Sequence, residues 1–337
     1  MDIYDISKKT GVSIATVSRV INGSSNVSEK TRAKVLAAIN ESGYTPNVFA
    51  RGLGLNTMKT IGIMCADCSD PYLARAVYYT EEDLRKNGYD AILYCTGYDR
   101  GVKSQCMSKL LTKRVDAVIL AGSNYVEEDD RLNGYIKDAA KTVPVMIING
   151  FLDAPGVYCA VCDDCTAVYE VTEKLLGSGR KKPLYVYNSL SYSGIRKLRG
   201  FKSAVEDGGL AEEDGAAVFV SEAGSVKAAE DAITEYADKG GSFDCVIASD
   251  DILAAGALKY ARTRGLSVPD QLAVTGYNNS NIAECCVPEL TSVDNRLEAL
   301  CRHCVSSLME LFADGKAFVP KKTVYSCEIV ERETAKF

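Results

Sequence analysis

Long apolar runs, histidine and the common catalytic motifs are scarce in this sequence. No stretch approaches the ~20 apolar residues that a membrane helix requires, so we expect no membrane partner. The N-terminal segment MDIYDISKKT has no apolar core and no cleavage site, which favours a cytoplasmic protein over an exported one. Histidine occurs once, at His303, and neither a nucleophile elbow nor a phosphate-binding P-loop motif is present. We therefore expect no enzymatic activity and no cofactor.

Cysteine, unlike histidine, is plentiful, with 13 copies. In a reducing compartment these are most simply free thiols, and their odd number argues against a complete disulfide framework. Zinc needs four ligands that converge tetrahedrally, whereas small buried thiols need no such geometry. We expect no metal site, and keep metal or thiol sensing as the minor alternative. The clusters with metal-like spacing are Cys65 and Cys68, Cys159 to Cys165, and Cys301 and Cys304.

Composition and charge indicate a globular protein with a basic N-terminal part. The 337 residues are 47% hydrophobic and 25% charged, enough for two or three folding units. Residues 1–60 carry eight Lys and Arg against four Asp and Glu, while the rest of the chain is acidic. A small basic end on an acidic body suits a head that binds a polyanion, although chance clustering would look the same.

Helical patterns occupy residues 5–11, 14–22 and 29–42, and a glycine-containing turn joins the first two. Ser13 and Ser28 are suited to cap the second and third helices. Helix, short turn, helix is the helix-turn-helix pattern, in which the second helix enters the major groove of DNA. A generic three-helix bundle is the alternative. Apolar positions recur every three or four residues and should face a common core: Val17, Val20 and Ile21 in the second helix, and Val35, Leu36 and Ile39 in the third.

The other face of the second helix carries small and basic side chains that suit double-stranded DNA. Arg19 can bond a guanine edge through two parallel hydrogen bonds, and Ala15 can contact a thymine methyl group. Ser18, Asn22 and Ser28 are suited to phosphate contacts. The residue types therefore predict DNA as a partner.

The segment YDISKKTGVSIATVSRVINGSSNVSEKTRAKVLAAINESGYTPNVFARGL resembles the headpiece of the LacI/GalR family of bacterial repressors. Its most specific parts are GVSIATVSRVING, VSEKTRAKV and GYTPN. The resemblance implies that Ile14, Ala15 and Arg19 contact bases. It also implies contacts to the DNA backbone from Tyr4, Thr16, Ser18, Asn22, Ser28 and Thr31.

Residues 46–58 form a hinge after the headpiece. A helix of seven or eight residues is too short to be stable alone in water, so we expect this one to fold on DNA beside its twin in a dimer. The resemblance places Leu53 where a leucine wedges into the minor groove, although a plain linker residue is the alternative. Gly52 and Gly54 each cost a helix about 1 kcal/mol relative to alanine, which indicates a loose hinge.

From residue 59 onward, short apolar runs alternate with helical patterns in two successive sets. Continuous apolar strands separated by helices indicate parallel sheets covered on both faces, and two sets imply two lobes that enclose a cleft. The pieces KNGYDAIL, KRVDAVILAGS and ASDDILAAGALKYARTRGLSVPDQLAVTGYNN resemble the body of the same family. The predicted fold is an all-α helix-turn-helix headpiece plus an α/β two-lobed, periplasmic-binding-protein-like body of two doubly wound parallel sheets.

The predicted domains are a headpiece (1–45), a hinge (46–58) and an effector-binding and dimerisation domain (59–337). The resemblance implies three crossovers between the lobes. The expected division is lobe one at about 59–158 with 290–320, and lobe two at about 159–289 with 321–337.

Polar residues at predicted strand ends are candidates for the ligand cleft. Tyr72 could stack on a ring of the ligand, and Lys197 stands where the family has an arginine. Lysine is a point donor and cannot repeat a bidentate contact. Asn278 replaces a family aspartate, so both departures leave open a ligand other than a plain sugar. The remaining candidates are Ser123, Asp163, Asp250, Asp251 and Asn295, with helix capping as the alternative role of each.

Together these patterns predict a sequence-specific DNA-binding transcriptional regulator, a repressor by analogy with the family. It would bind a pseudo-palindromic operator as a homodimer and respond to a small-molecule effector, a sugar or related metabolite, in the cleft. The alternative is a sugar-binding receptor without a DNA role.

Overall fold

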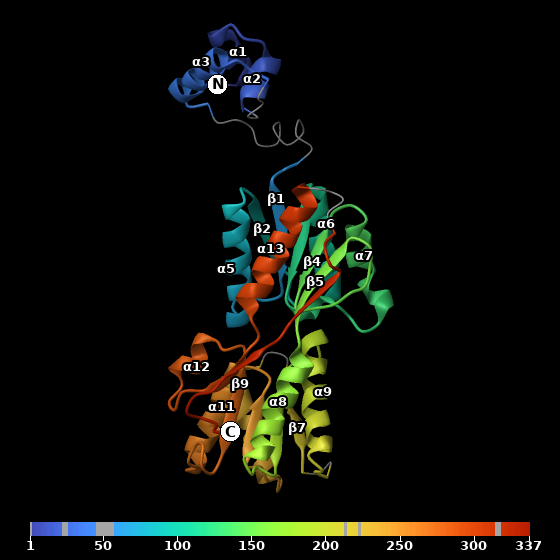
Figure 1. The fold of residues 1–337 in the computed structure, drawn as a ribbon, viewed down its shortest axis with the longest axis vertical. Coiled ribbons are helices and arrows are strands. Elements are labelled where there is room, and N and C mark those ends of the chain that lie inside the picture. The colour runs from blue at the N-terminus through green and yellow to red at the C-terminus, as the bar shows by residue number, and fades with distance from the viewer. Residues whose placement is uncertain (1, 22–25, 45–56, 212–213, 222–223, 314–317) are drawn as a thin grey trace.

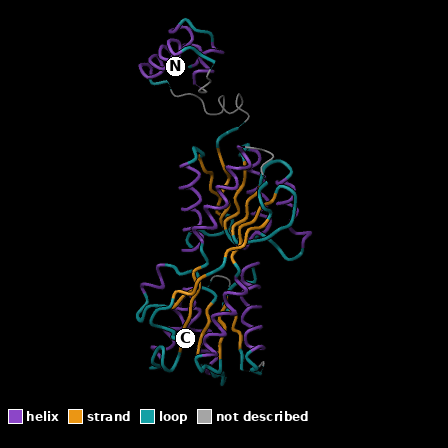
Figure 2. The backbone as a smooth tube through the Cα atoms, in the orientation of Figure 1, coloured by secondary structure: helices purple, strands orange, loops and turns teal. Residues whose placement is uncertain are grey.

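Helices alone form the N-terminal part of the described chain, and strands alternate with helices in the rest (Figures 1 and 2). Among the described residues, no helix is both long enough and apolar enough to cross a bilayer. The computed structural model describes residues 2–21, 26–44, 57–211, 214–221, 224–313 and 318–337.

The headpiece consists of α1 (Ile3–Thr10), α2 (Ile14–Ile21) and α3 (Glu29–Ser42). α1 begins two residues earlier than its apolar pattern predicts, because the side chain of Asp2 caps it by accepting backbone N–H groups of the first turn. The predicted cap of α3 is confirmed, since Ser28 accepts the N–H of Thr31.

The headpiece core is formed by one apolar face from each helix. Ile6, Val17, Val20 and Val35 are buried there. Leu36 was expected in this core but is 43% exposed. It follows Val35 directly, and one step around an α-helix turns a side chain by about 100°, which takes it off the buried face.

Lobe one is built on a six-stranded sheet in the order β11-β5-β4-β3-β1-β2, and all its strand pairs are parallel. Its elements are β1 (Thr60–Cys65), α5 (Pro71–Lys86), β2 (Asp90–Cys95), α6 (Arg100–Thr112), β3 (Ala117–Ala121), η1 (Ser123–Tyr125), η2 (Asp130–Asn133), α7 (Gly134–Ala140), β4 (Val145–Ile148), β5 (Val157–Cys162), α13 (Leu297–Ala313) and β11 (Lys322–Tyr325).

Lobe two is built on a second six-stranded sheet in the order β12-β10-β9-β8-β6-β7, in which only β12 runs antiparallel to its neighbour. Its elements are α8 (Asp164–Gly177), β6 (Pro183–Tyr187), α9 (Tyr192–Asp207), β7 (Ala216–Phe219), α10 (Val226–Asp238), β8 (Cys245–Ala248), α11 (Asp251–Arg264), β9 (Ala273–Tyr277), α12 (Asn281–Cys285), β10 (Thr291–Asp294) and β12 (Glu328–Val330).

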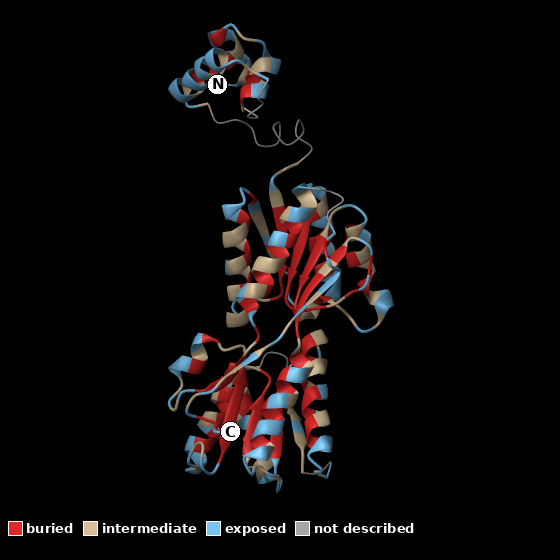
Figure 3. Ribbon diagram, in the orientation of Figure 1, coloured by how far each residue is buried: buried red, intermediate tan, exposed pale blue. Residues whose placement is uncertain are grey.

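Both sheets have buried central strands, as their sequences predict. β3 is buried at every position, and so are β4, β8 and β9. Helices cover both faces of each sheet, and Figure 3 shows the buried strands between half-exposed helices. Parallel strands covered on both faces need this continuous apolar pattern.

The chain crosses between the lobes several residues later than expected at each point. β5 and β11 belong to the first sheet, and β10 belongs to the second. The expected boundaries after residues 158, 289 and 320 are therefore wrong, since the crossings follow β5, β10 and β11. A strand's own apolar pattern does not reveal which sheet it pairs with, because pairing depends on residues distant in sequence.

Candidate functional site

The residues of α2 that were expected to contact bases all lie on its exposed side. Ile14 is 39% exposed, unusual for a large apolar side chain, and Ala15 and Arg19 are also exposed. Val17 and Val20 point the opposite way, into the headpiece core. The helix therefore presents an apolar and a basic group together, which can contact a thymine methyl group and a guanine edge respectively.

The described residues that were expected to hold the DNA backbone are distributed over all three headpiece helices. Tyr4 on α1 is 65% exposed. At the start of α3, the hydroxyls of Ser28 and Thr31 lie 2.9 Å apart. Helix N-termini and serine or threonine hydroxyls suit phosphate oxygens. Thr16 and Ser18 are partly exposed on α2, whereas Asn22 and the hinge residue Leu53 lie outside the described residues.

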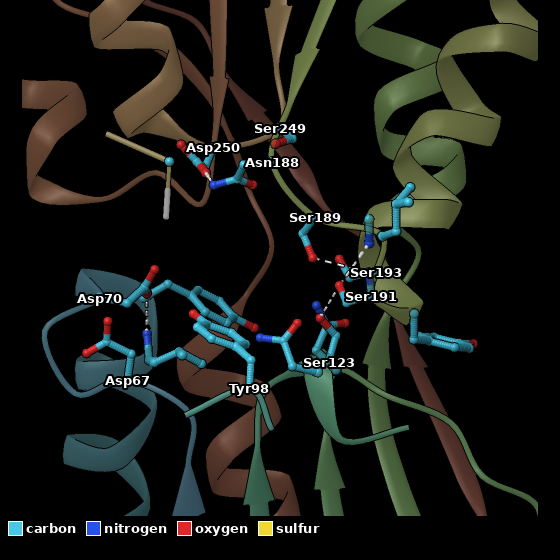
Figure 4. Close-up of a pocket in the computed structure, with 18 of the residues that line it drawn as sticks. Asp67, Asp70, Tyr98, Ser123, Asn188, Ser189, Ser191, Ser193, Ser249 and Asp250 are labelled. Atoms are coloured by element: carbon cyan, nitrogen blue, oxygen red, sulfur yellow. Dashed lines mark hydrogen bonds between the residues drawn. The ribbon is translucent and has the colours of Figure 1, made fainter. Parts of the chain in front are cut away.

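A cavity of about 890 Å³ lies between the lobes of the body (Figure 4). Its walls come from the loops that follow β1, β2, β3 and β4 in lobe one, and β6, β8 and β9 in lobe two. These are the carboxyl ends of parallel strands, where open α/β sheets bind ligands. Its volume is within the ~300–1,000 Å³ typical of small-molecule pockets.

Six of the eight expected cleft residues line this cavity and two do not. The two that do not are Asp163 and Asn295. Asp163 caps α8 by accepting the N–H and hydroxyl of Thr166. Asn295 is buried and donates a hydrogen bond of 2.9 Å to the side-chain oxygen of Asn278, which it holds in place. The six that line it are Tyr72, Ser123, Lys197, Asp250, Asp251 and Asn278.

Asp250 is a half-buried carboxylate at the start of α11. One oxygen accepts the N–H of Leu253 at 2.8 Å, and the other accepts the side-chain amide of Asn188 at 3.1 Å. Burial raises the pKa of Asp250 to about 6. Burial also raises the pKa of Asp70, which caps α5 on the opposite wall. Two carboxyl groups thus face the cavity from different lobes (Figure 4).

Asp251 lines the same cavity but serves the fold. Its carboxylate accepts the N–H and hydroxyl of Ser280, each at 2.7 Å, and the hydroxyl of Ser292 at 2.6 Å. With both oxygens occupied, Asp251 fixes the loop that follows β9. A ligand would meet that loop, where Asn278 stands, more readily than the carboxylate itself.

Lys197 is 8% exposed and held by the protein. Its ammonium group donates to the carbonyl of Ser249 at 2.9 Å and lies 3.5 Å from the centre of the Tyr277 ring. The Tyr277 hydroxyl in turn donates to Asp164 at 2.6 Å. Lys197 therefore contributes one fixed positive charge to the floor of the cleft and no planar fork.

Side chains also bridge the cleft directly. The hydroxyls of Ser123 in lobe one and Ser191 in lobe two lie 2.9 Å apart. At another point, Arg75 of α5 approaches the carbonyl of Asn279 at 3.5 Å. These contacts join the lobes in the arrangement seen here.

The charged groups around the cavity are predominantly acidic. Seven acidic side chains and two lysines, Lys103 and Lys197, line the cavity. The ammonium nitrogen of Lys103 lies 3.8 Å from a carboxylate oxygen of Glu127, which is one of the seven acids. An anionic ligand would be repelled by this excess, whereas a neutral one with many hydroxyls would find donors and acceptors throughout. The acids are Asp67, Asp70, Glu127, Glu128, Asp129, Asp250 and Asp251.

The cysteine spacings do not build a metal centre in the described part of the chain, where no group of three or more His, Cys, Asp or Glu side chains is arranged to hold an ion. Cys301 and Cys304 instead face the core of lobe one from α13.

Two family models match the chain over most of its length. One, described as "Bacterial regulatory proteins, lacI family", matches residues 2–47, and the other, "Periplasmic binding proteins and sugar binding domain of LacI family", matches residues 58–319. The chain belongs to the LacI/GalR family. The sequence-based recognition of the family is thereby confirmed.

Individual LacI-family relatives agree with this assignment. An HTH-type transcriptional regulator of Lachnoclostridium phytofermentans is 48% identical over 337 residues, 100% of both chains. The structure of the transcriptional regulator CelR in complex with cellobiose has a TM-score of 0.72 at 25% identity, and the match covers 99% of this chain and 100% of that one. A Lac repressor dimer bound to operator and the anti-inducer ONPF has a TM-score of 0.88 at 23% identity, with 99% and 98% covered, and shows the same fold.

The chain is thus a DNA-binding transcriptional regulator whose relatives are regulators and not enzymes. The alternative of a sugar receptor without a DNA role is wrong, because the headpiece family matches as well as the body.

Several cleft residues of this LacI-family chain were missed by sequence reasoning. The sequence-based candidates did not include Tyr98 after β2, Asn149 after β4 or Asn188 after β6, all of which line the cavity. The polar run NSLSYS directly after the apolar strand PLYVY was the available indication for Asn188 and Ser191.

Proposed function

We propose that this chain is a cytoplasmic repressor that binds a pseudo-palindromic operator as a homodimer and senses a neutral saccharide in the inter-lobe cleft. The observation that carries the ligand class is the cavity lining, rich in hydroxyls, amides and carboxylates with an acidic excess. Tyr72 and Tyr98 add aromatic rings on the lobe-one wall, and rings pack against the apolar faces of sugars while polar groups bond their hydroxyls. The similarity to CelR, solved with cellobiose, supports the same class.

The operator half of the proposal is supported by the α2 face. Its exposed Ile14, Ala15 and Arg19 combine an apolar contact with a bidentate donor, so base discrimination would rest on one guanine and neighbouring thymine methyl groups. Two such heads in a dimer would contact half-sites about one helical turn apart. Ligand binding would alter DNA affinity by favouring one arrangement of the lobes.

The ligand class is tested by thermal shift and calorimetry on the full-length protein with neutral mono- and disaccharides, sugar phosphates and nucleobases. We expect a neutral saccharide to raise the melting temperature and sugar phosphates to have little effect. Stabilisation by a phosphorylated sugar alone, or by a nucleobase alone, would contradict the saccharide assignment.

Two matched variants localise the site. Asp250→Asn and Asp163→Asn each replace a helix-capping aspartate by asparagine, which caps equally well. Only Asp250 lines the cavity, so Asp250→Asn should weaken saccharide binding and Asp163→Asn should not.

Gel shifts with genomic fragments, with and without the saccharide, then test operator binding. Equal binding to all fragments at every salt concentration would contradict the operator role.

A further inference from the structure

Three cysteines meet at the carboxyl end of the lobe-one sheet. Cys65 ends β1 and Cys95 ends β2, and the two are direct partners in the parallel register. Cys68 lies in the loop after β1, with its sulfur 2.9 Å from the sulfur of Cys95. Cys65 is buried, Cys68 is partly exposed and Cys95 is exposed. The last two therefore form a thiol pair within reach of solvent.

We propose that Cys68 and Cys95 are an oxidisable dithiol, a modification site that small-molecule disulfides convert into an intrachain bond. A disulfide has an S–S length of about 2.05 Å, so the two sulfurs need to approach by less than about 1 Å. The backbone beside the pair is held together, because the N–H groups of Thr96 and Gly97 donate to the carbonyls of Cys65 and Ala66 at 2.8 and 2.9 Å.

The chemistry is a thiol–disulfide exchange in two steps. One thiolate of the pair attacks the small disulfide, which forms a mixed disulfide and releases one small thiolate. The second cysteine, deprotonated by solvent, attacks the protein sulfur of that mixed disulfide and releases the other small thiolate. The two protein thiols lose two protons and two electrons, and the small disulfide gains both electrons as it becomes two thiols.

Accessibility separates this pair from the other cysteines near it. Burial raises the pKa of Cys65 far above its usual range, which keeps that thiol protonated and unreactive. The hydrogen bond to Cys68 raises the pKa of Cys95 more modestly. The exchange should therefore proceed slowly at neutral pH and accelerate in alkaline buffer, as the thiolate fraction grows.

The bond would join two segments of the lobe-one wall of the cleft. Cys68 stands between Asp67 and Ser69, which line the cavity and are hydrogen-bonded to each other. Tyr98 follows Cys95 by three residues and lines the same wall (Figure 4). Oxidation would tie the β1–α5 loop to the end of β2, and so restrict two segments that any ligand in the cleft must contact.

The test uses the full-length protein, first reduced, then exposed to oxidised glutathione, quenched with N-ethylmaleimide and mapped by mass spectrometry. We expect Cys68 and Cys95 to lose their maleimide labels and a peptide pair linked through these two residues to appear, both reversed by dithiothreitol. Amide hydrogen exchange at residues 66–70 and 96–98 should slow at least threefold on oxidation.

Variants make the outcome decisive. Cys68→Ser and Cys95→Ser should abolish the link, leave a glutathione adduct on the remaining cysteine and remove the change in exchange. Cys285→Ser replaces an exposed cysteine of lobe two, and this variant should still form the Cys68–Cys95 link and show the slower hydrogen exchange. The proposal is overturned if wild type links Cys65 instead, forms an interchain dimer through Cys95 on a non-reducing gel, or leaves both thiols free when glutathione has already modified Cys285.

Discussion

At the scale of single residues, Arg19 and Asp250 show how surroundings decide what a side chain can do. Arg19 lies on the exposed side of α2, opposite Val17 and Val20, so its planar fork is available to an outside partner. Asp250 lies at a helix start inside the cleft, where burial opposes its charge. Arg19 is therefore suited to bind a base edge. The Asp250 carboxylate is disfavoured in its charged form, and a ligand that donates hydrogen bonds to it would stabilise that form.

Arg19→Lys should relax base discrimination with little loss of nonspecific affinity. Lysine keeps the positive charge but cannot form two parallel hydrogen bonds to guanine, a contact worth about 1–3 kcal/mol of discrimination. Competition binding between the operator and singly substituted operators measures this. Lys8→Ala on α1, which removes one charge elsewhere, should weaken all sequences alike. Unchanged discrimination in Arg19→Lys would contradict base contact by this residue.

Asp250 should make the free energy of unfolding depend on pH. Its folded pKa of about 6 lies above the ordinary value of 3.8, so the folded state holds the proton more tightly between these values. Stability from this group is present below about pH 4 and is lost as pH rises through about 6. Asparagine does not titrate, so Asp250→Asn should not lose this stability. The free energy of unfolding of the variant relative to wild type should therefore rise by on the order of 1–2 kcal/mol from pH 4 to pH 7. Melting temperatures across that range measure it, and a constant difference would refute it.

At the scale of elements, α8 and α9 pack so closely that no side chain fits between them at Gly200. A Cβ atom there would overlap the carbonyl oxygen of Cys165 and lie 3.1 Å from the backbone nitrogen of Tyr169. The close approach sets the position of α9, and α9 carries Lys197 while its capping residue, Ser191, faces the cleft. Helix packing thereby determines part of the ligand site.

Gly200→Ala should destabilise the protein by about 1–3 kcal/mol, because the helices must move apart to admit one methyl group. Gly177→Ala is the matched control, since Gly177 is the last residue of α8 and a Cβ there meets nothing within 4 Å. That control should be neutral or stabilising by about 0.5–1 kcal/mol. Scanning calorimetry compares the two, and equal melting temperatures would show that the packing relaxes freely.

At the scale of the whole molecule, three crossings of the chain and a few polar contacts connect the lobes. The hydrogen bond between Ser123 and Ser191 spans the cleft, and Arg75 approaches Asn279 from the opposite lobe. Such contacts exist only when the lobes are close, so they favour the closed arrangement. A ligand that bridges both walls would add to the same preference.

Ser123→Ala should lower the affinity for the cleft ligand by roughly two- to tenfold. The cross-lobe hydrogen bond is worth about 0.5–1.5 kcal/mol, and its loss makes closure around the ligand less favourable. The matched control is Ser108→Ala on the surface of α6. The Ser108 hydroxyl donates to the carbonyl of Ser104 in its own helix, so its removal should leave affinity unchanged. Calorimetric titration of both variants decides the matter, and an unaffected Ser123→Ala would mean that closure does not depend on this contact.

The amino-acid order alone determined the helix-turn-helix pattern, the alternation of strands and helices, and the exposed side of α2. Capping side chains such as Ser28 and the spacing of apolar residues act over a few positions, so a linear reading captures them. The Asp-Asp pairs at 163–164 and 250–251 show what the sequence alone did not determine. Both follow a strand and start a helix, yet only the second pair lines the cavity. The local chemistry is the same in both, and only the pairing of distant strands decided which pair faces the cleft.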